Sequence, residues 1–581
     1  MPIEYSVNIA YDDIYNDYEA VDIDALLADI PTKMALALVC HYNAQIHTQE
    51  KNPQFQIQAI SEWSQRFTPA TRQKIQNVID RFNARQASNF NFINNVSSLL
   101  FIEKLLVIHN DLPVVGDLTE LQEENLFKAY LYFSAKWTKA QVNGAIKYRD
   151  ISVSAMGLVM MLPYSELLEF KDFRLQFLKA VYFFKFCENN EIFKEYLEVF
   201  LKARSVSTWN EYVFNLVSVY IFLLGEDNVK SVLQFDEKSK NVFSSLENFC
   251  VDVQTFEAKE DFLTLRAAPI YKYSHNELLF LNINFLIDKI YQGIIFDFAD
   301  VLIANGVQYK GKPIKNRQQF FGIFGDEFIE PGLFYEVIKN VFRQKDYVHY
   351  TGDQLKTMFG EGAPDYLIID NAKVYAFEYK NTFFSGPVKY TFDIDKIKQE
   401  LDKKFVANEA GRPKGVSQLV NFIEDFSQGR YDMILKQKRE AHIIYPILVT
   451  QDFTFNLPVV YSLILSRYNE ILKASNRIDK RLQIKPITLI DLDLLVKFQD
   501  LFISKRLTLN HVLADYQKFL GHGKNSIDKS LSFHKYLHVK TSRIDYGSPK
   551  MFMEEIKNRL FPDKKEEHQP AVAKPTHNAE H

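Results

Sequence analysis

The chain has 581 residues, of which 47% are hydrophobic and 24% are charged, with a formal net charge of −4. This composition excludes a globally disordered protein, and the slightly acidic balance weighs against a general nucleic-acid coat while leaving room for a local basic channel. Cys40, Cys187 and Cys250 form no Cys-x-x-Cys pair, so neither a disulfide framework nor a cysteine zinc site is expected. A cytoplasmic protein is therefore expected. The most apolar helical run, 212–224, is too short to span a bilayer, so no membrane partner is expected.

Residues 1–255 are predicted to be mainly helical. Thr68-Pro69 has the pattern of an N-cap followed by proline at the first helical position, and Thr119-x-x-Gln122 has that of a capping box. No phosphate-binding loop or dinucleotide fingerprint occurs in this half of the sequence. We interpret it as a helical scaffold, or as a sensor or oligomerisation region that meets a second copy of the chain or a regulatory protein.

The pattern of residue types in the sequence changes after about residue 255. Segment 269–274 is rich in β-branched and aromatic residues, and so is 277–287, which fits either a strand or a buried helix. Segment 320–343 has a helical pattern, in which Pro331 and Gly332 mark a break or a helix start.

Strands are then expected as far as residue 490. The predicted order is strand, strand, strand, helix, strand, with one more short strand to follow. These elements are 347–350, 366–369, 374–379, the helix 416–426, 442–450 and 487–490. We expect residues 256–515 to form one domain, 516–561 a basic and aromatic C-terminal extension, and 562–581 a disordered tail.

The segment 360–381, GEGAPDYLIIDNAKVYAFEYKN, carries the clearest chemical signal. Asp365 heads one apolar run, and Glu378 and Lys380 lie near the end of the next, two residues apart and so on one face of a strand. A turn at Asp370-Asn371 would bring Asp365 near Glu378. The alternative without a chemical role is a surface hairpin with a salt bridge. Strands as apolar as these do not favour it.

This group of side chains suits the hydrolysis of a phosphodiester bond. That reaction needs an activated water and neutralised charge, which a hard cation held by oxygen ligands supplies. Asp365 and Glu378 are suitable ligands, and the backbone carbonyl of Tyr379 is a third. Lys380 is suited to orient or deprotonate the water, or to stabilise developing negative charge.

Pro364-Asp365, followed after twelve residues by Glu378-Tyr379-Lys380, resembles the PD-(D/E)xK nuclease superfamily, which has the restriction-endonuclease-like fold. The resemblance covers about residues 320–450. It implies an α/β domain with a mixed central sheet flanked by helices, in a chain that is α+β overall because a large helical region comes first. It also implies Mg²⁺ or Mn²⁺ at the site.

The same resemblance implies a glutamate from a helix before the first strand. Glu330 matches that position and Glu336 is its rival, while Glu327 lies in the same stretch. Residues six apart on a helix point about 240° from each other, so only one of the first two faces the metal. Gln418 matches a polar position that the family often has on the helix after the Glu-x-Lys strand; a solvated helix face explains it equally well.

Basic residues flank these elements. Lys312, Lys315 and Arg317 precede the helix with the glutamates, and Arg412 and Lys414 precede the Gln418 helix. We expect them to contact a nucleic-acid backbone, although most such clusters are solvated faces. His534 and His538 are four apart, but no acidic third ligand is evident, so no zinc site is expected.

The function expected from the sequence is a metal-dependent nuclease, with double-stranded DNA as its partner by resemblance to the family. A prokaryotic anti-phage defence or restriction effector is the biological analogy. Two alternatives stay open. One is a catalytically inactive nucleic-acid-binding scaffold of the same fold, and the other is an RNA-directed nuclease.

Overall fold

The computed structural model describes residues 7–49, 52–84, 90–150, 152–167, 170–225, 228–521, 531–544 and 547–560. The tail predicted at 562–581 lies outside these residues. Within them, none of the helices is long and apolar enough to cross a membrane.

Helices dominate the first half of the chain, as the sequence predicts. They are α1 (Tyr11–Ile14), α2 (Ile23–Leu27), α3 (Thr32–Gln49), α4 (Pro53–Trp63), α5 (Pro69–Ala84), α6 (Asn95–Ile108), α7 (Glu120–Ile146), α8 (Val153–Met161), α9 (Phe173–Asn189), α10 (Glu191–Ala203), α11 (Trp209–Leu224) and α12 (Lys240–Glu247). The predicted capping box starts α7, where Thr119 and Gln122 each accept a hydrogen bond from the other's backbone N–H. A two-residue strand pair, β1 (Val7–Asn8) and β2 (Phe90–Asn91), joins the segment before α1 to the segment before α6.

A small three-stranded sheet follows, in the order β3-β5-β4. It consists of β3 (Val232–Gln234), β4 (Ile270–Lys272) and β5 (Glu277–Phe280). The segment 277–287 turns out to be both a strand and a helix, because Asn282 stops β5 and accepts a hydrogen bond from the Phe285 N–H as the cap of the next helix. The connecting elements are α13 (Leu263–Ala267), α14 (Ile283–Asp288), α15 (Gln292–Ala304), β6 (Gln308–Tyr309) and β7 (Lys312–Pro313).

One helical rod leads into the central sheet. It runs as α16 (Arg317–Phe324), a wide π-helical stretch η5 (Gly325–Phe334) and α17 (Tyr335–Val341). The break or start predicted at Pro331 and Gly332 is neither, since the rod continues through both residues. Pro331 has no N–H to donate one turn back, and the chain accommodates it with a wider turn in which the Tyr335 N–H donates to the Glu330 carbonyl.

The central sheet is mixed and has six strands, in the order β8-β9-β10-β11, with β12 and β13 both beside β11. The strands are β8 (Tyr347–Thr351), β9 (Tyr366–Asp370), β10 (Lys373–Lys380), β11 (Ile443–Thr450), β12 (Gln483–Ile484) and β13 (Thr488–Asp491). The first three pair antiparallel, and β10, β11 and the last two pair parallel. The predicted mixed sheet is confirmed, but α18 (Gly352–Phe359) between β8 and β9 was not expected.

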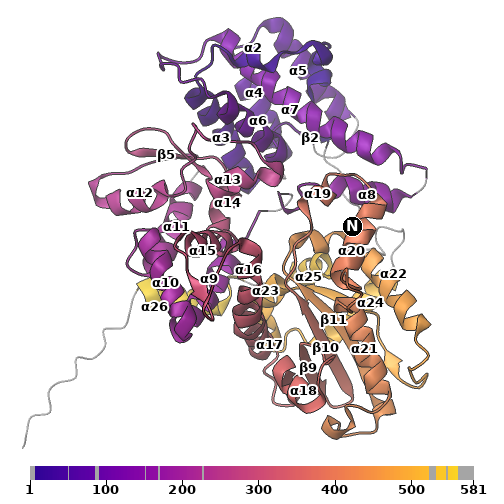
Figure 1. Ribbon diagram of the computed structural model, residues 1–581. Coiled ribbons are helices and arrows are strands. Elements are labelled where there is room, and N and C mark those ends of the chain that lie inside the picture. Colours follow the sequence, from indigo (N-terminus) through magenta and orange to yellow (C-terminus); the bar gives the residue numbers. More distant parts are fainter. Residues whose placement is uncertain are drawn as a thin grey trace, which may run out of the picture.

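Helices connect and cover this sheet. They are α19 (Gly386–Lys389), α20 (Ile394–Phe405), α21 (Gly415–Ser427), α22 (Pro458–Ala474), α23 (Leu492–Ile503), α24 (Leu509–Gly521), α25 (Phe533–Thr541) and α26 (Lys550–Leu560). Figure 1 shows α2–α7 gathered at one end of the molecule and β9–β11 at the other, with α9 and α16 between them and α17 beside the strands.

The buried apolar side chains do not divide at residue 255. One cluster joins side chains from 9–137 to others from 251–285, and a second extends from α7 and α8 through the central sheet to α26. Within the second, Phe183 and Phe186 of α9 lie 5.3 and 5.2 Å, centroid to centroid, from Phe328 of η5. The helical region therefore shares a core with the domain predicted to begin at 256.

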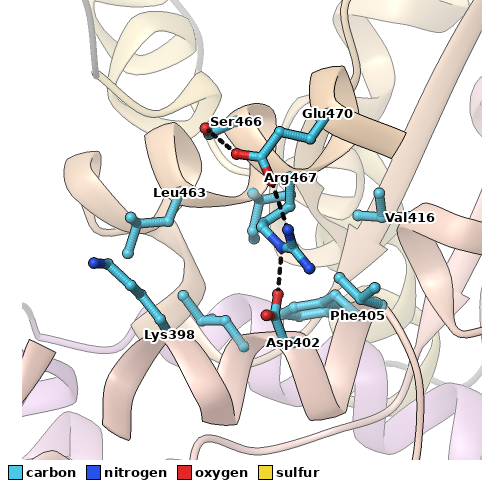
Figure 2. Close-up of a pocket in the computed structure, with 11 residues that line it drawn as sticks. Lys398, Asp402, Phe405, Val416, Leu463, Ser466, Arg467 and Glu470 are labelled. Atoms are coloured by element: carbon cyan, nitrogen blue, oxygen red, sulfur yellow. Dashed lines mark hydrogen bonds and ion pairs between the residues drawn. The ribbon is translucent and has the colours of Figure 1, made fainter. Parts of the chain in front are cut away.

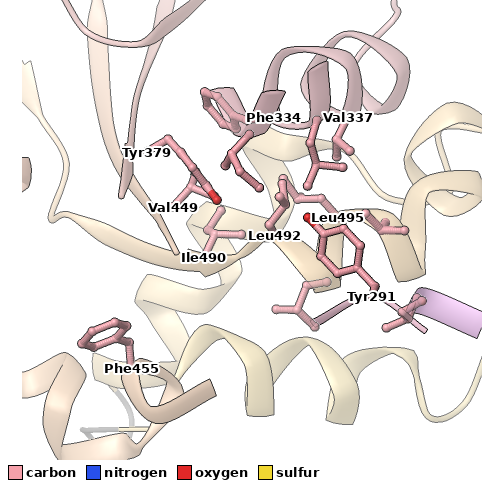
Figure 3. Close-up of a cluster of buried hydrophobic side chains, with 14 of the residues drawn as sticks. Tyr291, Phe334, Val337, Tyr379, Val449, Phe455, Ile490, Leu492 and Leu495 are labelled. Atoms are coloured by element: carbon pink, nitrogen blue, oxygen red, sulfur yellow. The ribbon is translucent and has the colours of Figure 1, made fainter. Parts of the chain in front are cut away.

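The same core holds the end of β10 against the helical rod. Tyr379 stacks on Phe334, with ring centroids 4.9 Å apart and planes 18° apart. Figure 3 shows these two rings beside Val449 of β11 and Leu492 of α23, with Tyr291 close by. The rod and the sheet are thus packed through the residue between Glu378 and Lys380.

A largely buried ionic cluster joins the helical region to α19, just after β10. Glu166 pairs with the guanidinium of Arg266 (2.5 Å) and with the ammonium of Lys389 (2.9 Å). Lys389 also lies 3.7 Å from Asp261, whose carboxylate accepts a hydrogen bond from the Tyr390 hydroxyl at 2.6 Å. Burial alone would raise the pKa of Glu166, but Arg266 and Lys389 outweigh it and hold that pKa at about 2.

Removing one cation from this cluster should be costly. Lys389→Met leaves buried carboxylates with less counter-charge, and we expect a loss of about 3 kcal/mol in the free energy of unfolding. The shift of the urea unfolding midpoint measures it. Lys398→Met is the matched control, because Lys398 pairs with Asp395 on the surface, and it should leave the midpoint unchanged.

The stabilisation from Glu166 should depend on pH. Its folded pKa of about 2 lies below the ordinary glutamate value of 4.5, so the contribution is complete above pH 4.5 and is lost as the pH falls towards 2. We expect wild type to exceed Glu166→Gln in stability at pH 7, with the difference shrinking through this acid range. Urea unfolding of both proteins at several pH values tests it; a difference that does not change with pH contradicts it.

Candidate active site

The hairpin of β9 and β10 brings the predicted motif together. Their pairing ends with Tyr366 opposite Phe377, so Asp365 and Glu378 come next on the two strands. Asp365 Oδ2 accepts a hydrogen bond from the Tyr379 N–H at 2.7 Å, and the Lys380 ammonium donates to Glu378 Oε1 at 2.6 Å.

Glu378 is more deeply placed than the sequence indicates. Glu378 lies near the end of its strand, as the sequence predicts, but its side chain is 0% exposed. The reason is that β11 pairs with β10 as far as Lys380 and α21 packs against β10, so this end of the strand is covered. Its second oxygen, Oε2, is buried and has no hydrogen-bond partner among the described residues. A buried carboxylate oxygen without a hydrogen-bond partner lowers the free energy of unfolding. Glu378 is therefore held at this position for a purpose other than stability.

A pocket of about 460 Å³ opens beside Asp365. Its walls come from η5, the start of α17, α18 with the loop after it, and α21. The lining residues are Asp326, Glu330, Pro331, Tyr335, Gly352, Asp353, Lys356, Gly360, Glu361, Gly362, Ala363, Pro364, Asp365 and Gln418. Three of the predicted site residues, Glu330, Asp365 and Gln418, therefore face one space.

The loop from Gly360 to Pro364 forms one wall of this pocket. Gly360 and Gly362 have φ angles of 77° and 91°, which a residue with a side chain rarely adopts. Arg430, from the turn after α21, donates to the carbonyl of Glu361 at 2.9 Å and ties the loop to the helix of Gln418. The loop therefore has a fixed position at the mouth of the pocket.

The structure brings Glu330, and not Glu336, to the pocket. Glu330 Oε1 accepts a hydrogen bond from the Tyr335 hydroxyl at 2.6 Å, and its charge acts on Asp365 and Lys380. Glu336 is absent from the lining and instead influences Tyr366 and Tyr182. The wide turn of η5 explains why Glu330 and not Glu336 faces the pocket, because it changes which residues of the rod lie on the same face.

The other acidic and polar candidates are also placed. Glu327 accepts from the Tyr309 hydroxyl and pairs with Lys310 at 3.4 Å, away from the pocket. Gln418 lies in the first turn of α21, and its side-chain oxygen Oε1 is buried without a hydrogen-bond partner among the described residues. Glu327 thus has a structural partner, whereas Gln418 keeps an acceptor unused beside Asp365.

The electrostatics show an excess of negative charge. Burial, followed by repulsion from Glu378, raises the pKa of Asp365 to about 7. Burial and Asp365 raise the pKa of Glu330, and burial raises that of Glu378 against the opposing effect of Lys380. Burial would lower the pKa of Lys380, but Glu378 and Asp365 outweigh it and raise that pKa. Carboxyl groups with raised pKa values around one ammonium are typical of a site that takes a further cation.

The donor set fits Mg²⁺ or Mn²⁺ in chemistry. Asp365, Glu378 and Glu330 supply carboxylate oxygens, and Tyr379 and Gln418 supply carbonyl oxygens, which are the ligands that these hard cations prefer. Within the described part of the chain, however, no three or more His, Cys, Asp or Glu side chains are arranged to hold a metal. Glu378 Oε1 is turned to Lys380 and Asp365 Oδ2 to the Tyr379 N–H, which leaves Glu378 Oε2 as the carboxylate oxygen without a partner among the described residues.

The predicted backbone-binding residues do not line the pocket. Lys312, Lys315 and Arg317 are exposed around β7 and the start of α16, and Arg317 pairs with Asp300 at 2.5 Å. Arg412 is exposed before α21, and Lys414 is the N-cap residue of that helix. Only the last two belong to the segment that leads to Gln418.

Other hollows lie elsewhere, and two of them adjoin helices or strands of the central sheet region. Figure 2 shows one of about 420 Å³ between α20, α21 and α22, where Arg467 is held by Asp402 (2.8 Å) and Glu470 (2.5 Å) over an apolar floor. The other, of about 150 Å³, lies at the carboxyl ends of β11 and β13.

The second of these hollows contains the two histidines. His534 and His538 have ring centroids 4.6 Å apart, and Asp491 Oδ2 lies 3.8 Å from His534 Nδ1. The sequence showed no acidic neighbour for this pair because Asp491 is distant along the chain. Its position directly after an apolar strand was the one available signal, since the carboxyl ends of parallel strands gather polar groups.

Removing a carboxylate from the candidate site should stabilise the metal-free protein. Asp365→Asn keeps an acceptor for the Tyr379 N–H but removes a buried negative charge next to Glu378. We expect the free energy of unfolding in chelator at pH 8 to rise by on the order of 1–3 kcal/mol. Asp353→Asn, at an exposed position of the same pocket, is the control and should have no effect. Equal or lower stability of Asp365→Asn contradicts the expectation.

No protein-family model, curated protein or solved structure matches the chain. The resemblance to PD-(D/E)xK nucleases therefore depends on the motif itself. What the structure adds is the position of the motif: adjacent ends of β9 and β10 in a mixed sheet, beside a pocket that also receives Glu330 and Gln418.

Proposed function

We propose that the chain is a divalent-metal-dependent nuclease that hydrolyses phosphodiester bonds. The observation that carries the proposal is the convergence of Asp365, Glu378 and Lys380 at adjacent strand ends, with Glu330 facing Asp365 across a pocket. Burial and mutual repulsion explain the raised pKa values of the Asp365, Glu378 and Glu330 carboxyl groups. A bound cation would relieve both effects.

Each residue has a role in the proposed chemistry. Asp365, Glu378 and the carbonyl of Tyr379 would hold Mg²⁺ or Mn²⁺, with Glu330 and Gln418 beside them. When bound, the cation would neutralise charge on the scissile phosphate and make a water more acidic. Lys380 keeps its proton because its neighbours are anionic, so stabilising negative charge on the phosphate suits it better than acting as a base.

The substrate class is nucleic acid, and double-stranded DNA is the member that the family resemblance favours. Arg412 and Lys414 are the basic residues best placed to contact its backbone, because they start the segment that carries Gln418. By analogy of architecture, a helical region joined to such a site suits a cytoplasmic anti-phage defence or restriction effector, with a second copy or a regulatory protein as a partner of the helical region.

One observation favours the alternative of an inactive nucleic-acid-binding scaffold. Glu378 and Asp365 already have internal partners, and no ready group of three or more metal-binding side chains occurs in the described residues. Such a protein would bind nucleic acid in the presence of chelator and with Asp365 replaced by alanine.

Incubation of the purified chain with plasmid DNA and with labelled RNA, in Mg²⁺, in Mn²⁺ and in chelator, tests the proposal. We expect metal-dependent cleavage, reduced by at least about a hundredfold in Glu378→Gln and in Lys380→Ala. Lys373→Ala is the matched control, because Lys373 lies at the opposite end of the same strand, where it pairs with Asp370. It should cleave like wild type.

The outcomes separate the candidates. Cleavage of RNA alone identifies the RNA-directed enzyme. Chelator-insensitive binding without cleavage identifies the inactive scaffold, and cleavage that survives Glu378→Gln shows that the site lies elsewhere.

A further inference from the structure

The wide turn of η5 sets two side chains on one side of the helical rod. In a regular α-helix, residues five apart point roughly 140° from each other. Here the Tyr335 N–H donates to the Glu330 carbonyl, five residues back, so the two residues lie one above the other. The Tyr335 hydroxyl then reaches Glu330 Oε1 at 2.6 Å. Only the widened turn permits this contact.

The surroundings of Tyr335 leave its ring little freedom. The residue is 7% exposed, and its ring lies 5.6 Å from that of Tyr366 and 5.8 Å from that of Phe334, centroid to centroid. A side chain fixed in this way has already lost its rotamer entropy, so its hydroxyl is a preorganised donor.

A glycine makes room for the hydroxyl. Gly352 donates its N–H to the carbonyl of Asp365 at 2.7 Å, which places the start of α18 directly on the residue before β9. A Cβ at Gly352 would lie 2.7 Å from the Tyr335 hydroxyl oxygen and 3.0 Å from the Asp365 carbonyl oxygen. The absence of a side chain at this position thus lets Glu330, Tyr335 and Asp365 share one corner of the pocket.

The chemistry of the donor matters as well. The phenol is neutral, so it orients the Glu330 carboxylate without cancelling its charge, unlike the ammonium that occupies Glu378 Oε1. With Oε1 taken by the phenol, Glu330 Oε2 is the oxygen left to face a cation.

We propose that Tyr335 is a positioning residue that fixes the Glu330 carboxylate towards Asp365, and that Gly352 provides the space this requires. The inference rests on the proposed function, because it gives Glu330 a place in the cation site. Tyr335 touches neither substrate nor metal in this scheme; it acts through Glu330. Hydrogen-bond partners of metal ligands typically contribute about ten- to a hundredfold to metal affinity.

The experiment measures Mn²⁺ binding to the full chain by electron paramagnetic resonance, without nucleic acid. We expect Tyr335→Phe to weaken Mn²⁺ binding by about tenfold or more while the Tm stays near that of wild type, since the ring is kept. Gly352→Ala should weaken binding in the same direction. In cleavage assays, Tyr335→Phe should raise the Mn²⁺ concentration needed for half-maximal rate, with most of kcat recovered at saturating Mn²⁺.

Tyr375→Phe is the matched control. Tyr375 is a buried tyrosine of β10 whose hydroxyl has no hydrogen-bond partner among the described residues, so losing that hydroxyl should leave Mn²⁺ binding within twofold of wild type. Asp365→Asn is the reference for the cation site and should abolish tight binding.

Two results overturn the inference in distinguishable ways. If Asp365→Asn reduces Mn²⁺ binding but Tyr335→Phe binds like wild type, Tyr335 has no positioning role and the proposed function still stands. If wild type binds no Mn²⁺, or binds it regardless of Asp365, the cation site is wrong and both proposals fail.

Discussion

The position of β10 between β9 and β11 is the constraint on which the candidate site depends. Antiparallel pairing on one side sets Asp365 next to Glu378, and parallel pairing on the other side covers the strand end that carries Glu378 and Lys380. A one-residue slip of β10 against β9 or β11 would turn Glu378 to the opposite face of the sheet. Because β10 is buried on both faces, such a slip would also exchange the large side chains of Tyr375 and Phe377 with the small one of Ala376 across the sheet, so packing strongly specifies the register.

This arrangement has a cost that other parts of the molecule offset. Three carboxyl groups with raised pKa values lie around one ammonium, and two buried oxygens, Glu378 Oε2 and Gln418 Oε1, have no hydrogen-bond partner among the described residues. The stacked rings of Tyr379 and Phe334 and the ionic cluster around Lys389 flank the same strand end. Strain of this kind is expected where function and stability conflict, and the surrounding packing keeps the strand in place.

The sequence predicted much of this fold because its signals are local. Alternating or continuous apolar runs located the central strands, and the Thr119 capping box marked the start of a helix. The motif was visible because a hairpin makes its members neighbours in sequence as well as in space. Contacts between distant segments were not predictable in this way: Asp491 beside His534, and Glu166 beside Lys389, lie 43 and 223 residues apart. The wide turn at Pro331 was also missed, because a proline predicts an interruption and not its geometry.

The shared core limits how this architecture can vary. Phe183 and Phe186 of α9 pack on Phe328, two residues before Glu330, so a helix from the first half of the chain supports the rod that carries a candidate site residue. If the helical region were a module that could be exchanged for another, it would contact the sheet through a polar surface from which it could separate. Here the boundary is continuous, and it consists of a shared apolar core together with the ionic cluster around Lys389. The helical region and the sheet must therefore change together, and a relative that replaced one would have to rebuild the other.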